Sequence, residues 1–103
     1  MLIKVLIRRR IQDNKTKEAR TLLNSLRIAA MNQPGYISGE TLFNQYDPKC
    51  IMVISIWQSA DDWYKWKESD ERKDSEGQFD KLLQEPAEYE AFEVVSTNLW
   101  KFV

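Results

Sequence analysis

The chain of 103 residues contains no histidine. Histidine is the commonest general base near neutral pH, a frequent metal ligand and the usual axial ligand of heme iron. Its absence excludes every nucleophilic pair that joins serine or cysteine to histidine. Catalysis stays open, but it must use other side chains.

Cysteine is nearly absent as well, because Cys50 is the only one. A single cysteine cannot form a disulfide within the chain, which favours a reducing compartment. Arg8, Arg9 and Arg10 follow the apolar start of the chain, whereas a signal peptide has the opposite charge order. No apolar run approaches the ~20 residues of a membrane span. We therefore expect a cytoplasmic protein.

Neither sign of charge dominates, since 15 basic residues balance 16 acidic ones and leave a net charge of -1. Proteins that bind nucleic acid or anionic membranes concentrate basic residues on one surface, so we predict neither partner. Charged residues make up 30% of the chain and hydrophobic ones 43%, which is ordinary globular composition. The length suits one domain over residues 1–103.

Hydrophobic spacing predicts four strands and two helices. Runs that are apolar on both faces, or that alternate in period two, predict strands at 2–11, 36–46, 51–57 and 89–95. Apolar residues three and four apart predict a helix over 15–31, capped by Asp13 or Asn14. A second helical stretch starts after the cap residue Ser59, pauses near Ser69 and ends before Pro86.

The order β-α-β-β-α-β predicts an α+β, ferredoxin-like domain with helices on one face of a four-stranded antiparallel sheet. The first and third strands are apolar on both faces, so the second sheet face also needs a cover. In so short a chain we expect the same face of another copy to provide it, which makes a homodimer. The apolar tail 96–103 either straps this junction or folds back on its own sheet. We expect a second subunit to supply walls to any sizeable pocket.

Three segments carry a family resemblance: 3–10 (IKVLIRRR), 34–41 (PGYISGET), and 54–59 (ISIWQS) with the Trp63, Trp66, Ser69 and Asp70 that follow. They resemble the antibiotic biosynthesis monooxygenase family of dimeric α+β barrels. That family includes cofactor-independent oxygenases of aromatic polyketides, heme-degrading enzymes, quinone-handling proteins and modifiers of signal aldehydes. The resemblance implies a dimeric α+β barrel and covers nearly the whole chain.

The heme-degrading branch of the family resembles this chain at Trp66, which matches the tryptophan of that branch's pocket. Its heme-ligating histidine falls near Glu76, and its first-strand asparagine near Ile7. A carboxylate is a poor heme ligand. We therefore expect no heme-degrading activity and no bound cofactor or metal.

Six residues form the candidate site. The candidate catalytic residues are Arg9, to stabilise a substrate anion, and Trp66; the candidates for substrate binding are Trp57, Tyr36, Glu40 and Trp63. Aromatic rings supply flat apolar area, and a guanidinium stays charged and donates in a fork. Each residue also has a structural interpretation: the aromatic side chains can pack in the core, and the charged ones can form ion pairs.

Other polar groups receive structural interpretations. The acidic residues of 61–76, Glu76 among them, lack metal-site spacing and are interpreted as a solvated helix face. Tyr64 and Tyr89 are expected to pack at the edge of the core, and Cys50 lies at a hairpin.

Three functions stay open at this point. The first is a cofactor-independent monooxygenase that acts on a small aromatic or quinol-type substrate in the pocket of a homodimer. The second is a non-catalytic domain of the same fold that binds a small ligand or serves as an accessory dimerisation domain. The third is a purely structural dimerisation unit, whose own side chains fill the pocket.

Overall fold

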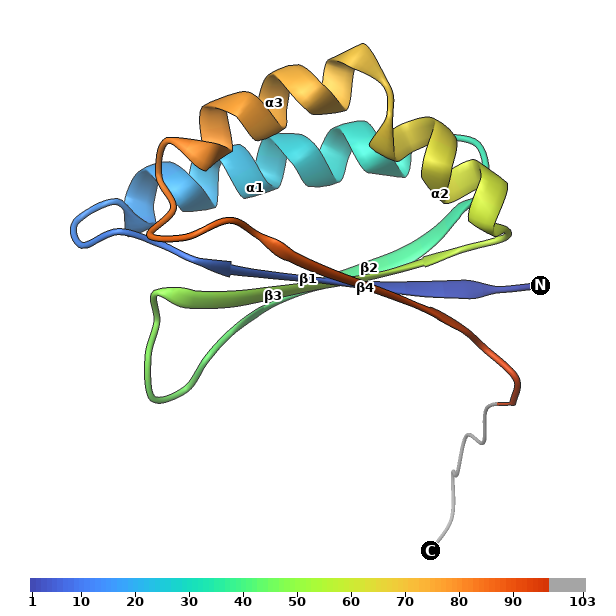
Figure 1. The fold of residues 1–103 in the computed structure, drawn as a ribbon, viewed down its shortest axis with the longest axis horizontal. Helices are drawn as coiled ribbons and strands as arrows, with labels where there is room; N and C mark the ends of the chain where they lie inside the picture. The colour runs from blue at the N-terminus through green and yellow to red at the C-terminus, as the bar shows by residue number, and fades with distance from the viewer. Residues whose placement is uncertain (97–103) are drawn as a thin grey trace, which may run out of the picture.

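A computed structural model describes residues 1–96 of the chain, and it has the expected α+β, ferredoxin-like architecture. The sheet contains β1 (Ile3–Arg10), β2 (Tyr36–Phe43), β3 (Cys50–Trp57) and β4 (Glu88–Glu93), antiparallel in the order β2-β3-β1-β4. The helices are α1 (Thr16–Met31), α2 (Ala60–Lys67) and α3 (Asp70–Asp80), and all three cover the same sheet face (Figure 1). The strap predicted for the tail falls on residues 97–103, outside the described part.

Strand β1 shows how the sequence selects the two sheet faces. Successive side chains of a strand point to opposite faces. Ile7 and Arg9 are accordingly buried beneath the helices, whereas Arg8 is exposed on the opposite face. The three consecutive arginines are therefore divided between the two faces of the sheet.

Two helix boundaries differ in detail from the prediction. Neither Asp13 nor Asn14 caps α1, because the helix begins after Lys15 without a side-chain cap and Asn14 has a φ of 64°. Asparagine tolerates this left-handed conformation, so Asn14 serves the turn rather than the helix. The pause predicted near Ser69 is a break between two helices. Ser59 accepts the N–H of Asp62 at the start of α2, and Ser69 caps α3 in the same way.

Strand β2 ends at Phe43 rather than at Tyr46. The Oδ1 atom of Asn44 accepts the backbone N–H groups of Tyr46 and Asp47 at 2.8 and 3.0 Å. A side chain that bonds the backbone two or three residues ahead replaces strand pairing by a turn. Strand β4 likewise covers Glu88–Glu93 rather than 89–95.

Two clusters of buried apolar side chains lie between the sheet and the helices. The first contains Ile11, Ala19, Leu23, Ile51, Phe79, Leu82 and Leu83, and the second contains Val5, Ile7, Trp57, Trp63 and Trp66. The second cluster is the more aromatic one, and it lies under α2. Among the helices of residues 1–96, none is both long enough and apolar enough to span a membrane.

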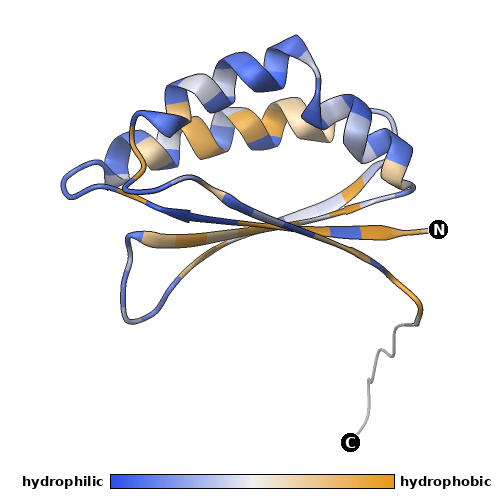
Figure 2. Ribbon diagram, viewed as in Figure 1, coloured by the Kyte–Doolittle hydropathy of each residue, from blue (hydrophilic) through white to orange (hydrophobic). Residues whose placement is uncertain are grey.

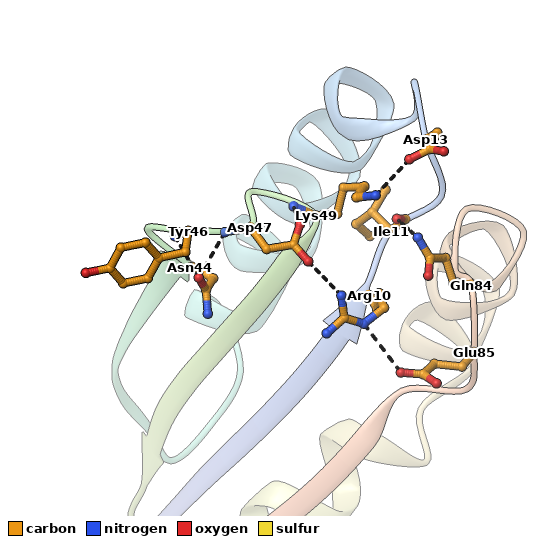
Figure 3. A network of polar contacts seen from close by, with 9 residues as sticks. All are labelled: Arg10, Ile11, Asp13, Asn44, Tyr46, Asp47, Lys49, Gln84 and Glu85. Carbon is orange, nitrogen blue, oxygen red and sulfur yellow. Dashed lines mark hydrogen bonds and ion pairs between the residues drawn. The ribbon is translucent and has the colours of Figure 1, made fainter.

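A polar network ties three loops together at one end of the sheet (Figure 3). Arg10 pairs with Asp47 at 2.7 Å and with Glu85 at 3.7 Å, and Lys49 pairs with Asp13 at 2.8 Å. The network joins the end of β1 to the β2–β3 hairpin and to the loop before β4. It holds the ends of elements that are far apart in the sequence.

No helix covers the second face of the sheet within residues 1–96 (Figure 1). Apolar side chains from neighbouring strands meet on this open face: Leu6 pairs with Ile54, and Met52 pairs with Leu42. Leu42 and Phe92 are 43% and 50% exposed. Figure 2 shows hydrophobic colour along β3 and in the first part of β1, whereas the C-terminal end of β1 and most of α3 are hydrophilic. One of the two apolar faces predicted for β1 and β3 therefore lies under the helices, and the other is left uncovered.

Candidate functional site

A cavity of about 60 Å³ lies between the helices and the sheet. Its walls come from β1, β2, β3, α1, α2 and α3. The lining residues are Ile7, Arg9, Leu23, Leu26, Arg27, Ala30, Tyr36, Gly39, Glu40, Thr41, Val53, Ser55, Trp57, Trp63, Trp66, Arg72 and Glu76. All six candidate residues are among them. The described residues of one chain line this small cavity, and the expectation that a second subunit supplies walls to a sizeable pocket stays a prediction.

Three tryptophans form the aromatic wall of the cavity. Trp57, Trp63 and Trp66 are 1%, 6% and 4% exposed. The rings of Trp57 and Trp63 lie 5.8 Å apart, and Tyr36 meets Trp57 edge-on at 5.4 Å. The Trp57 indole N–H donates to Ser55 Oγ at 3.0 Å, so its one polar atom is satisfied inside the protein. Trp63 and Trp66 lie three residues apart on α2, and both pack in the cluster that contains Val5 and Ile7 of β1.

Beside this wall lies a buried chain of charged groups. Arg9 of β1 donates to Glu76 Oε1 of α3 at 2.5 Å, and Arg72 approaches the same oxygen at 3.2 Å. Arg72 also donates to the Tyr89 hydroxyl at 2.9 Å. The interpretation of Glu76 as part of a solvated face is therefore wrong. Its i,i+4 spacing from Arg72 was the available signal, but the partner on β1 lies 67 residues away in sequence.

Of the two tyrosines expected at the edge of the core, only Tyr64 departs from that expectation. Tyr64 is 58% exposed on α2, so its predicted packing is wrong. Tyr89 is 38% exposed and its hydroxyl accepts from Arg72, with the guanidinium 5.4 Å from its ring. Tyr89 therefore holds the buried Arg72 side chain by a hydrogen bond from the partly exposed edge of the core.

Arg9 has a fully buried donor without a partner within residues 1–96. Its side chain is 2% exposed and lies 4.7 Å from the centre of the Phe79 ring, but its Nε–H has no acceptor among the described residues. A buried donor without an acceptor costs about 1–3 kcal/mol. Such a group is rare in native proteins and calls for a water, an ion or a ligand.

The mouth of the cavity lies between α1 and the edge strand β2. A surface groove there shares five residues with the cavity: Leu23, Arg27, Gly39, Glu40 and Thr41. Glu40 is exposed and pairs with Ile54 of the open face, so it lies at the rim rather than inside the cavity. Of the two charged candidates, only Arg9 is buried.

Tyr36 lies at this mouth as a neutral donor. Burial raises the pKa of its phenol above 10.0, and the positive charge of Arg27 offsets part of that increase. The phenol therefore keeps its proton at neutral pH. A Cβ atom on Gly39 would collide with the Tyr36 hydroxyl, so the absence of a side chain at Gly39 makes room for this group.

The size of the cavity limits what it holds. By the requirement of about 10–15 Å³ for each water, it has room for roughly four to six water molecules. Cavities that admit benzene measure about 150 Å³, so a single ring enters only if side chains at the mouth move outward. Arg27, Glu40 and Thr41 at the mouth are exposed. No group of three or more possible metal ligands occurs within residues 1–96.

Comparison with known proteins places these features in a family. The sequence profile of antibiotic biosynthesis monooxygenases matches residues 2–78. No curated protein sequence matches the chain. The solved structures that resemble it share little sequence, and their likeness shows the fold alone.

A conserved protein from Methanosarcina mazei is 17% identical, with a TM-score of 0.85 over 89% of this chain and 91% of that one. SnoaB, a cofactor-independent oxygenase from Streptomyces nogalater, is 14% identical, with a TM-score of 0.84 over 93% of this chain and 95% of SnoaB. Rv0793 from Mycobacterium tuberculosis is 13% identical, with a TM-score of 0.86 over 94% of this chain and 98% of Rv0793.

Proposed function

This chain belongs to the antibiotic biosynthesis monooxygenase family, and from that premise we propose that it is a cofactor-independent monooxygenase of a small aromatic, quinol-type substrate. One observation carries the proposal: a buried guanidinium with an unused donor, Arg9, faces the same cavity as three tryptophans. SnoaB, a structural neighbour, is a cofactor-independent oxygenase.

The chemistry needs little from the protein. An ionised quinol passes one electron to oxygen, and the two radicals recombine at a ring carbon. Loss of water from the resulting peroxide leaves a hydroxyquinone: one oxygen atom enters the ring, the other leaves as water, and the quinol supplies all four electrons. Arg9 stabilises the phenolate, because a donor already oriented in a dry site reorganises little during the reaction. Trp57, Trp63 and Trp66 form the walls that exclude water, and Tyr36 and Glu40 lie at the entrance.

The proposed assembly is a homodimer in the cytoplasm, paired through the open sheet face. The apolar side chains of that face, such as Ile54 and Phe92, are left uncovered by residues 1–96. Apolar sheet faces of this kind are commonly buried against a second copy. The single Cys50 suits a reducing compartment.

Oxygen consumption with hydroquinone and its methylated analogues tests the proposed activity. Uptake should fall at least tenfold in Arg9→Lys, which keeps the charge but removes the Nε donor, and in Trp66→Phe. The matched control is Arg8→Lys, because Arg8 is the exposed neighbour on the opposite face and should keep full activity. Equal uptake by all four proteins, or none above the spontaneous rate, contradicts the proposal.

The small cavity favours a second candidate, a non-catalytic domain that binds a small ligand. A volume of about 60 Å³ lies below that of sites that admit benzene. This candidate predicts a ligand-dependent rise in melting temperature without oxygen uptake. The same panel of compounds therefore distinguishes the two functions.

A further inference from the structure

The buried charges around the cavity do not cancel. Arg9 and Arg72, 2% and 5% exposed, share the single carboxylate of Glu76, which leaves one positive charge in excess. An uncompensated charge is costly in a medium of low dielectric constant. We propose that the ligand supplies the counter-charge, so that the cavity selects a monoanion, a carboxylate or ionised phenol on a small body. This rests on the proposed binding site but not on its oxygen chemistry.

Arg9 is the group that meets the anion. One of its terminal nitrogens donates to Glu76, while its Nε–H is buried without an acceptor in the described part of the chain. A guanidinium binds an oxyanion through two N–H groups on one side of its plane, and such bonds are stronger than those between neutral groups. An oxygen of the ligand therefore accepts the buried Nε–H of Arg9.

The entrance carries the same sign of charge. Arg20 and Arg27 are two helical turns apart on α1, so they lie along the same groove, and both line it. Neither forms an ion pair within residues 1–96. The one acidic residue of this groove is the exposed Glu40. A cleft with an excess of positive charge raises the local concentration of anions and speeds their association.

Cavity size determines the orientation of the ligand. Room for roughly four to six waters suits a carboxylate or phenolate head better than a whole ring. The acidic oxygen therefore enters first and reaches Arg9, while the body of the ligand lies between Trp57 and the mouth. Tyr36 stays protonated there, so it donates a hydrogen bond and adds no negative charge.

Two matched pairs of compounds test the selection of charge: benzoate against benzamide, and acetate against acetamide. Each pair keeps the shape and replaces the anionic carboxylate by a neutral amide. Binding is followed by quenching of tryptophan fluorescence, since three of the four tryptophans line the cavity. We expect the anion of at least one pair to bind the wild-type protein at least tenfold more tightly than its amide. Equal affinities in both pairs, or no binding by any of the four compounds, overturn the inference.

Variants show which residues create the preference. Arg9→Lys should reduce the affinity for the anion at least tenfold and leave that for the amide unchanged. Arg27→Gln should lower the association rate of the anion and its dependence on salt. Arg8→Gln, on the opposite sheet face, is the control and should change neither. If Arg9→Lys does not fold, the wild-type affinities and the association rate of Arg27→Gln decide whether the inference holds. A preference for the anion over its amide that survives both substitutions rules out Arg9 and Arg27 as its source.

The outcomes separate this inference from the proposed activity. Benzoate has no quinol hydroxyls to oxidise, so its binding reports charge selection alone. Tight binding of benzoate without oxygen uptake from hydroquinone supports the inference and removes the oxygenase. Oxygen uptake together with equal affinities in both pairs of compounds supports the oxygenase and overturns the inference.

Discussion

Glu76 Oε1 accepts an N–H of Arg9 at 2.5 Å and joins α3 to β1 across 67 residues of sequence. The same oxygen lies 3.2 Å from Arg72, so one carboxylate holds two guanidinium groups beneath the helices. Without it two buried guanidinium groups would lie close together without a counter-charge. The Arg9–Glu76 pair therefore holds two residues of the cavity lining in place and holds α3 against the sheet.

Replacing Glu76 by glutamine should destabilise the protein strongly. The change leaves Arg9 and Arg72 buried without a counter-charge, and breaking a buried pair in this way costs about 3–5 kcal/mol. Urea denaturation measures the free energy of unfolding. Glu71→Gln on the exposed side of the same helix is the control and should change it by less than about 0.5 kcal/mol. Similar losses in both variants contradict a special role for Glu76.

Most of the fold was predictable because it follows from local patterns. The apolar runs located the four strands, and the cap Ser59 located the start of α2, whereas the start of α3 after Ser69 was predicted only as a pause within one helix. The ends of strands were less predictable. The turn made by the Asn44 side chain competes with strand pairing, and period-two alternation cannot reveal that competition.

The aromatic part of the candidate site was predictable for the same reason, whereas its charged part was not. Trp63 and Trp66 are three apart on a helix, so their shared face follows from the sequence. Glu76 lies among acidic residues that are mostly exposed, and only the packing of α3 on β1 brings it to Arg9. Contacts between elements distant in sequence decide which of several equivalent carboxylates is buried.

Two glycines should respond in opposite directions to alanine. Gly35 has a φ of 83°, and a Cβ atom there collides with the Asp62 side chain, which Ser59 holds by a hydrogen bond. The left-handed conformation alone costs a residue with a Cβ about 1–2 kcal/mol, so Gly35→Ala destabilises by at least that much. Gly77 lies inside α3 with open space around it, and Gly77→Ala should stabilise by about 0.5–1 kcal/mol. Thermal and urea denaturation of both variants measure the two changes, and a stabilised Gly35→Ala contradicts the turn described here.

Asp47 should contribute to the dependence of stability on pH. The hydrogen bond from Arg10 lowers the pKa of this carboxyl below its ordinary value of 3.8. Its stabilising effect is therefore present above that value and is lost as the pH falls through the lowered pKa. Asp47→Asn should be less stable than the wild type at pH 7, and the difference should shrink toward pH 2. Urea midpoints measured at several pH values test this expectation.

The control for Asp47 is Asp74→Asn on α3. Asp74 is exposed and forms no ion pair within residues 1–96. Asp74→Asn should have nearly the same urea midpoint as the wild type at every pH. If the stability of Asp47→Asn differs from that of the wild type by the same amount from pH 7 to pH 2, the protonation of Asp47 in the network of Figure 3 does not affect stability.

Ile54→Lys should separate the proposed homodimer into single chains. Ile54 lies near the middle of the open sheet face and pairs with Leu6, so the substitution places a charge where the apolar surface is expected to be buried. Analytical ultracentrifugation compares the mass of the variant with that of the wild type. Tyr64→Lys is the control, because Tyr64 is an exposed aromatic residue on the helical side and its substitution should leave the dimer intact. A wild-type protein that sediments as a single chain, or an Ile54→Lys variant that keeps the dimer mass, shows that the sheet face does not pair in this way.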